Sequence, residues 1–201
     1  MAKVLYIKAN AKLEGESRTF QISDSFITKY RELNPNDEII TLDLYKEGID
    51  FLPVEEMNLL RRPADGTGRD HPILKYAYQF FDSDKYIIAA PFWNLSIPAI
   101  LKAYIDYVTI NGITFKYTET GAVGLCTGKK ALHIVSRGGN YSTEPYSNYE
   151  MGDRYLRTIL GFLGIVDFTT ISADGLDVLG NDVNAIVTEA IAKANDLATT
   201  F

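Results

Sequence analysis

The sequence predicts an α/β domain in which a five-stranded, doubly wound parallel sheet is covered by helices on both faces. Five short apolar segments alternate with segments of helical periodicity along the 201 residues. Such continuous apolar runs, without the polar alternation of a half-exposed strand, indicate a parallel sheet buried between two helical layers. Right-handed crossovers then give the doubly wound order, in which ligands bind at the carboxyl ends of the strands.

Composition and charge narrow the class of protein. The chain is 46% hydrophobic and 23% charged, with one cysteine and a formal net charge of −6. Its length predicts a single domain over residues 1–201, and its acidity argues against nucleic acid as a partner. No apolar run approaches the roughly 18 residues of a membrane span, and the N-terminal segment is too short for a signal peptide. We therefore expect a cytoplasmic protein, which also suits the lone thiol of Cys126.

Helix start and stop signals define the expected elements. Ser17 is a good N-cap for the first helix, which Asn34-Pro35 ends, and Pro98 is tolerated in the first turn of a later one. Residues 45–68 are long and irregular, and residues 114–128 predict an excursion or hairpin. The expected strands are 4–7, 38–42, 86–90, 131–135 and 165–171, and the later helices are 73–81, 97–108, 151–163 and 182–197.

The loop after the first strand carries candidates for phosphate binding. It lacks a Gly-x-Gly-x-x-Gly fingerprint and a Gly-Lys-Ser/Thr loop, which argues against a tightly bound dinucleotide or a nucleoside triphosphate. Ser17, Arg18 and Thr19 instead stand at a helix start, where N–H groups and two hydroxyls suit a phosphate monoester. The alternative is that Ser17 serves only as an N-cap.

The loop after the third strand predicts a surface for a flat ring. Phe92, Trp93, Asn94 and Leu95 lie between two prolines, which favours a pre-shaped loop. The Asn94 amide can hydrogen-bond the edge of a heterocycle. The alternative is that the two aromatic residues only pack in the core or in an interface.

The loop after the fourth strand, Ser136 to Gly139, is expected to approach the same ring. Gly138 and Gly139 let the backbone come close to a bound ring and direct N–H groups at its carbonyl oxygens. Arg137 is a candidate to stabilise negative charge on a reduced ring. His133, inside the preceding strand, is expected to be a packed core histidine, and no residue cluster predicts a metal site.

Several segments, each weak alone, are informative in their order and spacing. They are KVLYI from Lys3, PFWNL from Pro91, LKAYID from Leu101, TFKYT from Thr114, GKKALHIVSRGG from Gly128 and EMGDRYLR from Glu150. Together they resemble the bacterial FMN-dependent NADH-azoreductases, relatives of the quinone reductases in the flavodoxin-like superfamily. The likeness covers nearly the whole chain.

The resemblance implies a flavodoxin-like fold with FMN as cofactor, one per subunit. It also implies a homodimer with active sites at the interface, for which residues 45–68 and Phe115–Tyr117 are apolar and aromatic enough. Packing within the monomer is the alternative for these segments. The implied contacts are Asn10, Ser17, Arg18 and Thr19 for the phosphate, Phe92, Trp93, Asn94 and Leu95 for the ring face, and Ser136, Arg137, Gly138 and Gly139 for the polar edge.

The implied activity is two-electron reduction of quinones by NADH or NADPH, and reductive cleavage of aromatic azo compounds to amines. Donor and acceptor would use one pocket in turn, in a ping-pong order, with the chemistry on the flavin and no side chain acting as acid or base. One alternative is a flavodoxin-type electron carrier that binds FMN without oxidising NAD(P)H. Another is a non-catalytic interaction protein with a vestigial flavin site.

Overall fold

A computed structural model describes residues 1–12, 15–60 and 66–201. Its main sheet contains five strands, all parallel, in the order β2-β1-β3-β6-β7. This arrangement confirms the predicted doubly wound α/β fold. The strands are β1 (Lys3–Lys8), β2 (Glu38–Asp43), β3 (Lys85–Ala89), β6 (Lys130–Ser136) and β7 (Asp167–Ala173).

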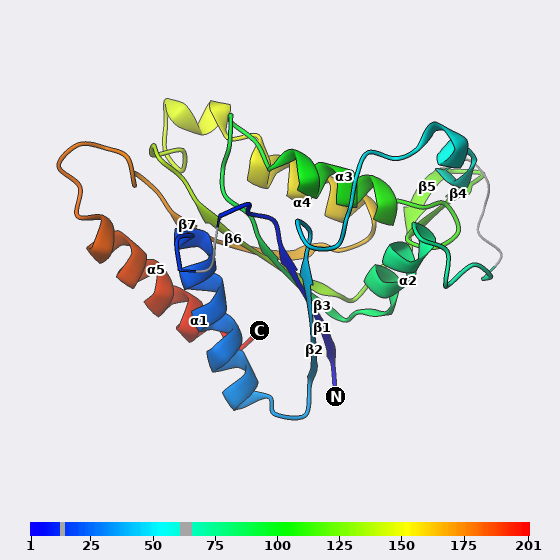
Figure 1. Ribbon diagram of the computed structural model, residues 1–201, viewed down its shortest axis with the longest axis horizontal. Helices are drawn as coiled ribbons and strands as arrows, with labels where there is room; N and C mark the ends of the chain where they lie inside the picture. Colours follow the sequence, from blue (N-terminus) through cyan, green and yellow to red (C-terminus); the bar gives the residue numbers. More distant parts are fainter. Residues whose placement is uncertain (13–14, 61–65) are drawn as a thin grey trace.

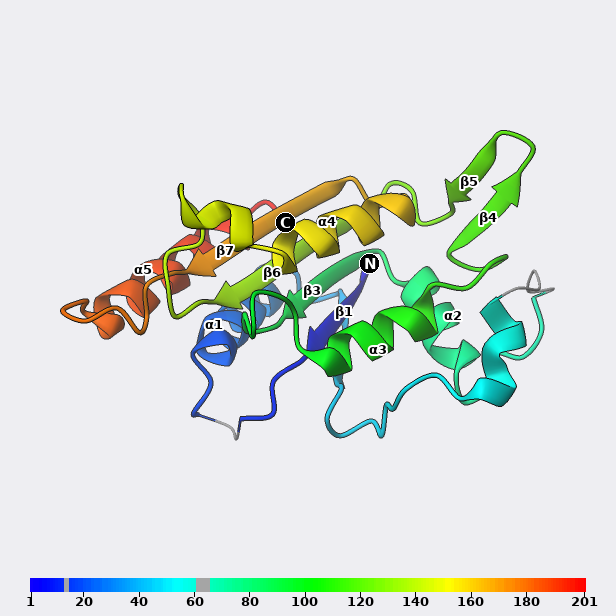
Figure 2. The same ribbon diagram turned by 90° about the horizontal axis from the view of Figure 1, so that it is seen from above.

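Helices cover both faces of the sheet (Figures 1 and 2). Side chains alternate along each strand, so on β1 Val4 and Tyr6 pack toward α1 and α5, whereas Leu5 and Ile7 pack toward α2, α3 and α4. Both sets are buried, which explains why the strands show no apolar–polar alternation in the sequence. The helices are α1 (Arg18–Leu33), α2 (Leu74–Asp82), α3 (Ala99–Val108), α4 (Gly152–Phe162) and α5 (Val183–Leu197).

The strand order changes direction between β1 and β3. β2 lies on one side of β1, whereas β3, β6 and β7 lie on the other. The connections that leave β1 and β3 therefore diverge toward opposite faces of the sheet, and a crevice forms at their carboxyl ends. Because β6 is the parallel neighbour of β3, the loop after β6 reaches the same edge.

A two-stranded antiparallel hairpin interrupts the alternation of strands and helices. It consists of β4 (Phe115–Thr118) and β5 (Gly121–Gly124) and projects beyond the main sheet (Figure 2). Its position confirms the predicted hairpin. Phe115 is only 5% exposed and packs on Phe162 with ring centroids 4.9 Å apart. Its side chain is therefore used within the subunit, whereas Tyr117 is 68% exposed.

The last strand begins two residues later than the sequence predicts. Gly164, with φ +100°, ends α4 in a Schellman motif: its N–H donates to the Gly161 carbonyl (3.0 Å), and the Ile165 N–H donates to the Leu160 carbonyl (2.9 Å). Ile165 is buried as part of this turn. Its apolar side chain resembles that of a strand residue in the sequence, although the helix cap holds it outside β7.

Candidate functional site

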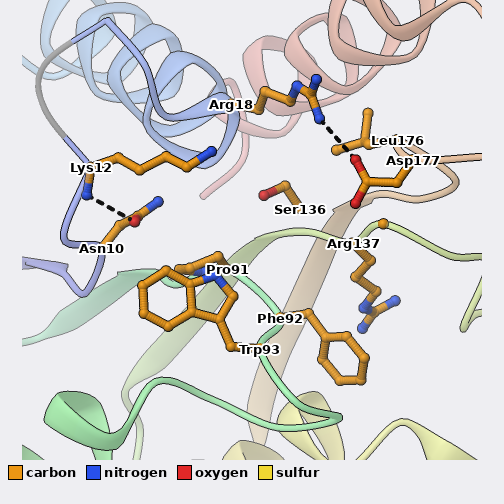
Figure 3. A pocket seen from close by; sticks show the side chains of 11 residues that line it. Asn10, Lys12, Arg18, Pro91, Phe92, Trp93, Ser136, Arg137, Leu176 and Asp177 are labelled. Carbon is orange, nitrogen blue, oxygen red and sulfur yellow. Dashed lines mark hydrogen bonds and ion pairs between the residues drawn. The ribbon is translucent and has the colours of Figure 1, made fainter.

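The carboxyl ends of β1, β3 and β6 surround a cavity of about 150 Å³ (Figure 3). A wider hollow of about 570 Å³ shares Phe92, Gly138 and Asp177 with it. All of the residues predicted from the sequence line one of these two spaces, except Ser17 and Thr19. The cavity is lined by Asn10, Lys12, Arg18, Pro91, Phe92, Trp93, Ser136, Arg137, Gly138, Leu176 and Asp177. The hollow adds Asn94, Leu95, Gly139, Tyr141 and Val178.

Ser17 and Thr19 lie behind the cavity wall. The Ser17 hydroxyl accepts hydrogen bonds from the Phe20 backbone N–H (3.1 Å) and from Asn10 Nδ2 (2.8 Å). The Thr19 hydroxyl lies 2.6 Å from that of Ser136. Ser17 is therefore the N-cap of α1 and also orients Asn10, while Thr19 braces α1 against the loop after β6.

Positive charge gathers where α1 begins. Lys12 and Arg18 line the cavity, and the N–H groups of Arg18 and Thr19 have no preceding helical turn to supply acceptors. Figure 3 shows Arg18 directed at Asp177, with 3.5 Å between Nη1 and Oδ1. Cations beside the N-terminus of a helix match the charge of a phosphate group.

The loop after β3 makes a tight turn at Asn94-Leu95. The N–H of Trp93 donates to the Ser96 carbonyl (2.9 Å), and the N–H of Ser96 donates to the Trp93 carbonyl (3.0 Å). Both residues between them have positive φ, 49° at Asn94 and 68° at Leu95. Leucine rarely adopts this conformation, and such strain concentrates at functional sites. The Met151 N–H holds the turn by donating to the Leu95 carbonyl at 3.0 Å.

The glycine pair after β6 is held from the side of β7. The carbonyl of Gly138 accepts from the Asp177 N–H (2.9 Å), and that of Gly139 accepts from the Gly175 N–H (3.0 Å). Within the described ranges, the N–H groups of the two glycines make no hydrogen bond. A Cβ atom at Gly138 would lie 2.3 Å from Asp177 Oδ2. The loop therefore offers backbone donors and has little room for a side chain.

Sequence reasoning missed the loop after β7. Leu176, Asp177 and Val178 line the cavity or the hollow, although only the loops after the first, third and fourth predicted strands were expected to do so. β7 is the parallel neighbour of β6, so its carboxyl end reaches the same edge of the sheet. Strand adjacency was the signal that could have found these residues. Lys12 and Tyr141 were missed because nothing in their local sequence sets them apart.

Comparisons with known proteins decide the family. Residues 2–197 match the family model described as a flavodoxin-like fold. FMN-dependent NADH:quinone oxidoreductase 2 of Clostridium acetobutylicum is 70% identical over 201 residues, which are 100% of both chains. The chain belongs to this family of flavodoxin-like oxidoreductases. An FMN-dependent NADH:quinone oxidoreductase of Caldicellulosiruptor saccharolyticus is 60% identical, again over 100% of both chains.

Solved structures of the oxidoreductase family have the same fold. An azoreductase from Bacillus anthracis has 34% sequence identity and a TM-score of 0.90, with 100% of each chain covered. An FMN-dependent NADH-azoreductase from the same species, solved in complex with FMN, has 30% identity and a TM-score of 0.89, covering 99% of this chain and 98% of that one. The resemblance stated from the sequence is therefore confirmed.

His133 lies in the core, as predicted, and takes part in a polar network beside the site. His133 Nδ1 lies 3.0 Å from Asp153 Oδ1 on α4, and Asp153 also accepts from Thr170 Oγ1 (2.5 Å) and Arg157 Nε (2.7 Å). Burial alone raises the pKa of the Asp153 carboxyl, but the hydrogen bonds from these three side chains and the charge interaction with His133 outweigh burial and hold the pKa well below its usual range. The network ties α4 to β6 and β7.

Asp153→Asn is expected to lower the free energy of unfolding by about 1–2 kcal/mol at pH 7, because hydrogen bonds to a charged group become bonds to a neutral one. The wild-type pKa is lower in the folded chain than in the unfolded chain. The carboxylate therefore contributes fully above about pH 5, and its contribution is lost as the pH falls through the folded value. Urea unfolding at about pH 5 and at about pH 2.5 should show the difference between the two proteins shrinking with acidity, because the loss occurs below the pKa of the unfolded carboxyl, about 3.9.

Asp167→Asn is the matched control, since its carboxylate is 59% exposed and lies 3.9 Å from Lys130. This variant should change the free energy of unfolding by less than about 0.5 kcal/mol at either pH. If the free energy of unfolding of the wild-type protein exceeds that of Asp153→Asn by the same amount at both pH values, the lowered pKa of Asp153 is contradicted.

The described ranges give little support to a reactive thiol, a metal site or a membrane-spanning helix. Cys126 is buried, and burial raises the pKa of its thiol to about 11, so the thiol stays protonated. Among the residues that the structure describes, no three His, Cys, Asp or Glu side chains are grouped to hold a metal ion. In the same part of the chain, no helix has the length and hydrophobicity required to cross a bilayer.

Proposed function

We propose that this chain is an FMN-dependent NADH:quinone oxidoreductase that also cleaves aromatic azo compounds. The observation that carries the proposal is the cavity at the β1/β3 crevice, which combines phosphate-binding cations with aromatic and amide groups. The names of its relatives and the FMN held by a structural neighbour support the same activity.

The phosphate end of FMN is assigned to the start of α1. Arg18 and Lys12 supply positive charge there, and the first N–H groups of the helix supply donors. Asn10, oriented by Ser17, adds a side-chain amide. The described residues thus match the charge and the hydrogen-bonding needs of a phosphate monoester.

The ring of FMN is assigned to the loops after β3 and β6. Phe92 and Trp93 offer aromatic surface on two sides of the cavity (Figure 3), and Leu95 adds apolar surface at the turn. The Asn94 amide and the N–H groups of the paired glycines suit the polar edge of a flavin, which carries both donors and acceptors. When bound, FMN supplies the redox chemistry by taking hydride from NADH and passing two electrons to the acceptor.

The chain's own residues bind and orient the reactants. The hollow of about 570 Å³ beside the cavity offers one space to the nicotinamide and then to a flat acceptor. A shared space imposes a ping-pong order. We propose that the chemistry occurs on the flavin and that no side chain around this space acts as acid or base.

A steady-state assay tests the proposal against a flavodoxin-type carrier. Under anaerobic conditions, protein loaded with FMN should oxidise NADH in repeated turnovers only when a benzoquinone is present, and double-reciprocal plots at several quinone concentrations should be parallel. A carrier would hold FMN without oxidising NADH. Intersecting lines would show a ternary complex and overturn the shared pocket.

The active protein is proposed to be a homodimer. Several segments that carry exposed apolar residues lie along the side of the sheet covered by α3 and α4 (Figure 1). They include the 3-10 helix Val54–Leu60. This helix belongs to the irregular segment predicted over residues 45–68, whose residues 61–65 lie outside the described ranges. Exposed apolar residues on one side of a molecule are typical of a subunit interface. The exposed apolar residues of these segments are Phe51, Val54, Met57, Tyr117, Val123, Tyr146, Tyr149, Met151 and Phe162.

Tyr117→Asp is expected to raise the dimer dissociation constant by about 10-fold, because it places a charge in an apolar interface. Sedimentation velocity over a range of concentrations would measure the change. Leu33→Asp is the control, since Leu33 is 46% exposed at the end of α1, on the opposite face of the sheet. Equal effects of the two variants, or a monomeric wild-type protein, would contradict the assigned interface.

A further inference from the structure

The guanidinium of Arg137 joins groups from four segments of the chain. The side chain is 4% exposed, with Nη2 3.2 Å from Glu150 Oε1 and Nη1 3.3 Å from Asp174 Oδ1. Nη1 also donates to Ser142 Oγ at 3.2 Å. The centre of the guanidinium lies 5.7 Å from the centroid of the Phe92 ring, and Figure 3 shows the two side by side. One cation thus connects the loops after β3, β6 and β7 with the segment before α4.

The two carboxylates are themselves fixed. Glu150 caps α4 by accepting from the N–H groups of Asp153 (2.9 Å) and Arg154 (3.3 Å). Asp174 accepts from the hydroxyls of Ser172, at 3.3 Å, and Ser142. Arg137 is therefore held between anchored partners, and its position determines where the neighbouring ring lies.

The position of the Phe92 ring is fixed by contacts with the loop after β6 and the start of α4. Its ring centroid lies 4.7 Å from that of Tyr141, and its N–H donates to the Ser136 carbonyl at 3.1 Å. A Cβ atom on Gly152 would lie 3.4 Å from its ring, so the start of α4 packs against it. Phe92 lines both the cavity and the hollow, and its displacement would alter both spaces.

The charge balance argues against an electrostatic role for Arg137. One positive charge faces two negative charges, Glu150 and Asp174, both nearly buried. The cluster as a whole therefore carries a formal charge of −1, so the two carboxylates offset the positive potential that Arg137 alone would present to a ring beside it. This differs from the expectation that Arg137 stabilises negative charge on the reduced ring.

We propose that Arg137 is a positioning residue of this site, which fixes Phe92 and the surrounding loops and does not act through its own charge on the flavin. The proposal deepens the proposed function and rests on it. Arg137→Lys is the decisive variant, because lysine keeps the charge and loses the planar fork that reaches both carboxylates. Glu150→Gln is the second, since it keeps the Arg137 charge, removes one negative charge and retains an acceptor for α4.

The first readout needs no flavin. Trp93 is the only tryptophan of the chain and directly follows Phe92, so acrylamide quenching of its fluorescence in the apoprotein reports how firmly the loop is held. Arg137→Lys should raise the quenching constant about 2-fold over the wild-type value, an order-of-magnitude expectation for loosening a packed loop. Arg31→Lys, at an exposed position in the last turn of α1, should leave it unchanged. An unaltered constant in Arg137→Lys would overturn the proposal.

The second readout separates position from charge in the FMN-loaded protein. Positioning predicts that Arg137→Lys and Glu150→Gln each lower kcat/KM for a benzoquinone by at least about 10-fold, while the midpoint potential of the flavin stays at the wild-type value. A charge role predicts wild-type rates in Arg137→Lys and a higher potential in Glu150→Gln, and that result would overturn the proposal. A wild-type protein that binds no FMN would overturn the proposed function as well.

Discussion

Arg18→Ala is expected to weaken FMN binding by about 10- to 100-fold, because charge-assisted hydrogen bonds to an anion contribute about 1.5–3 kcal/mol. The guanidinium lies at the start of α1, where it lines the cavity and pairs with Asp177 at 3.5 Å. A bound phosphate would replace this carboxylate, which is 77% exposed, as its partner. Isothermal titration of the apoprotein with FMN measures the effect.

Riboflavin and a second arginine provide the controls. Riboflavin has no phosphate, so Arg18→Ala should bind it as the wild-type protein does. Arg31→Ala removes an exposed arginine from the other end of the same helix and should leave the affinity for FMN unchanged. Equal losses for FMN and riboflavin would place the phosphate elsewhere.

Trp93→Ala is expected to raise the dissociation constant of FMN by about 10- to 100-fold. Stacking of a flat heterocycle on an aromatic side chain contributes about 1–3 kcal/mol, and Trp93 lines the cavity together with Asn10 and Lys12 (Figure 3). Trp93→Phe keeps an aromatic face and should lose less than about 5-fold. Absorbance titration with FMN compares the three proteins.

The wild-type protein gives an independent readout of the same contact. Because the chain has a single tryptophan, all of its indole fluorescence comes from Trp93. One equivalent of FMN stacked at the assigned position should quench most of this emission. Stoichiometric FMN binding without quenching, together with wild-type affinity in Trp93→Ala, would remove Trp93 from the site.

The sequence predicts the sheet and the location of the site because both follow from local patterns. Buried strands such as 4–7 and 131–135 are recognisable from continuous apolar runs, and strand ends in a doubly wound sheet mark the ligand crevice. β7 was placed too early because Ile165 is as apolar as a strand residue, although it belongs to the helix cap at Gly164.

Roles within the site depend on contacts between residues far apart in sequence, which local patterns do not contain. Thr19 lies 117 positions before Ser136 in the sequence, and their hydroxyls are hydrogen-bonded to each other. The Thr19 hydroxyl therefore does not line the cavity. Arg137 meets Asp174 and Glu150, and nothing in the Ser-Arg-Gly-Gly motif indicates two acidic partners. Asp177 joins the cavity only because β7 lies beside β6.

Anaerobic addition of NADH to the FMN-loaded protein, followed through the visible absorption band of the flavin, distinguishes an oxidoreductase from an electron carrier. We expect NADH to bleach the band in one step, before any acceptor is present, and one equivalent of a benzoquinone to restore it. A band that NADH leaves unchanged, in a protein that holds FMN, would contradict the oxidoreductase assignment and indicate an electron carrier.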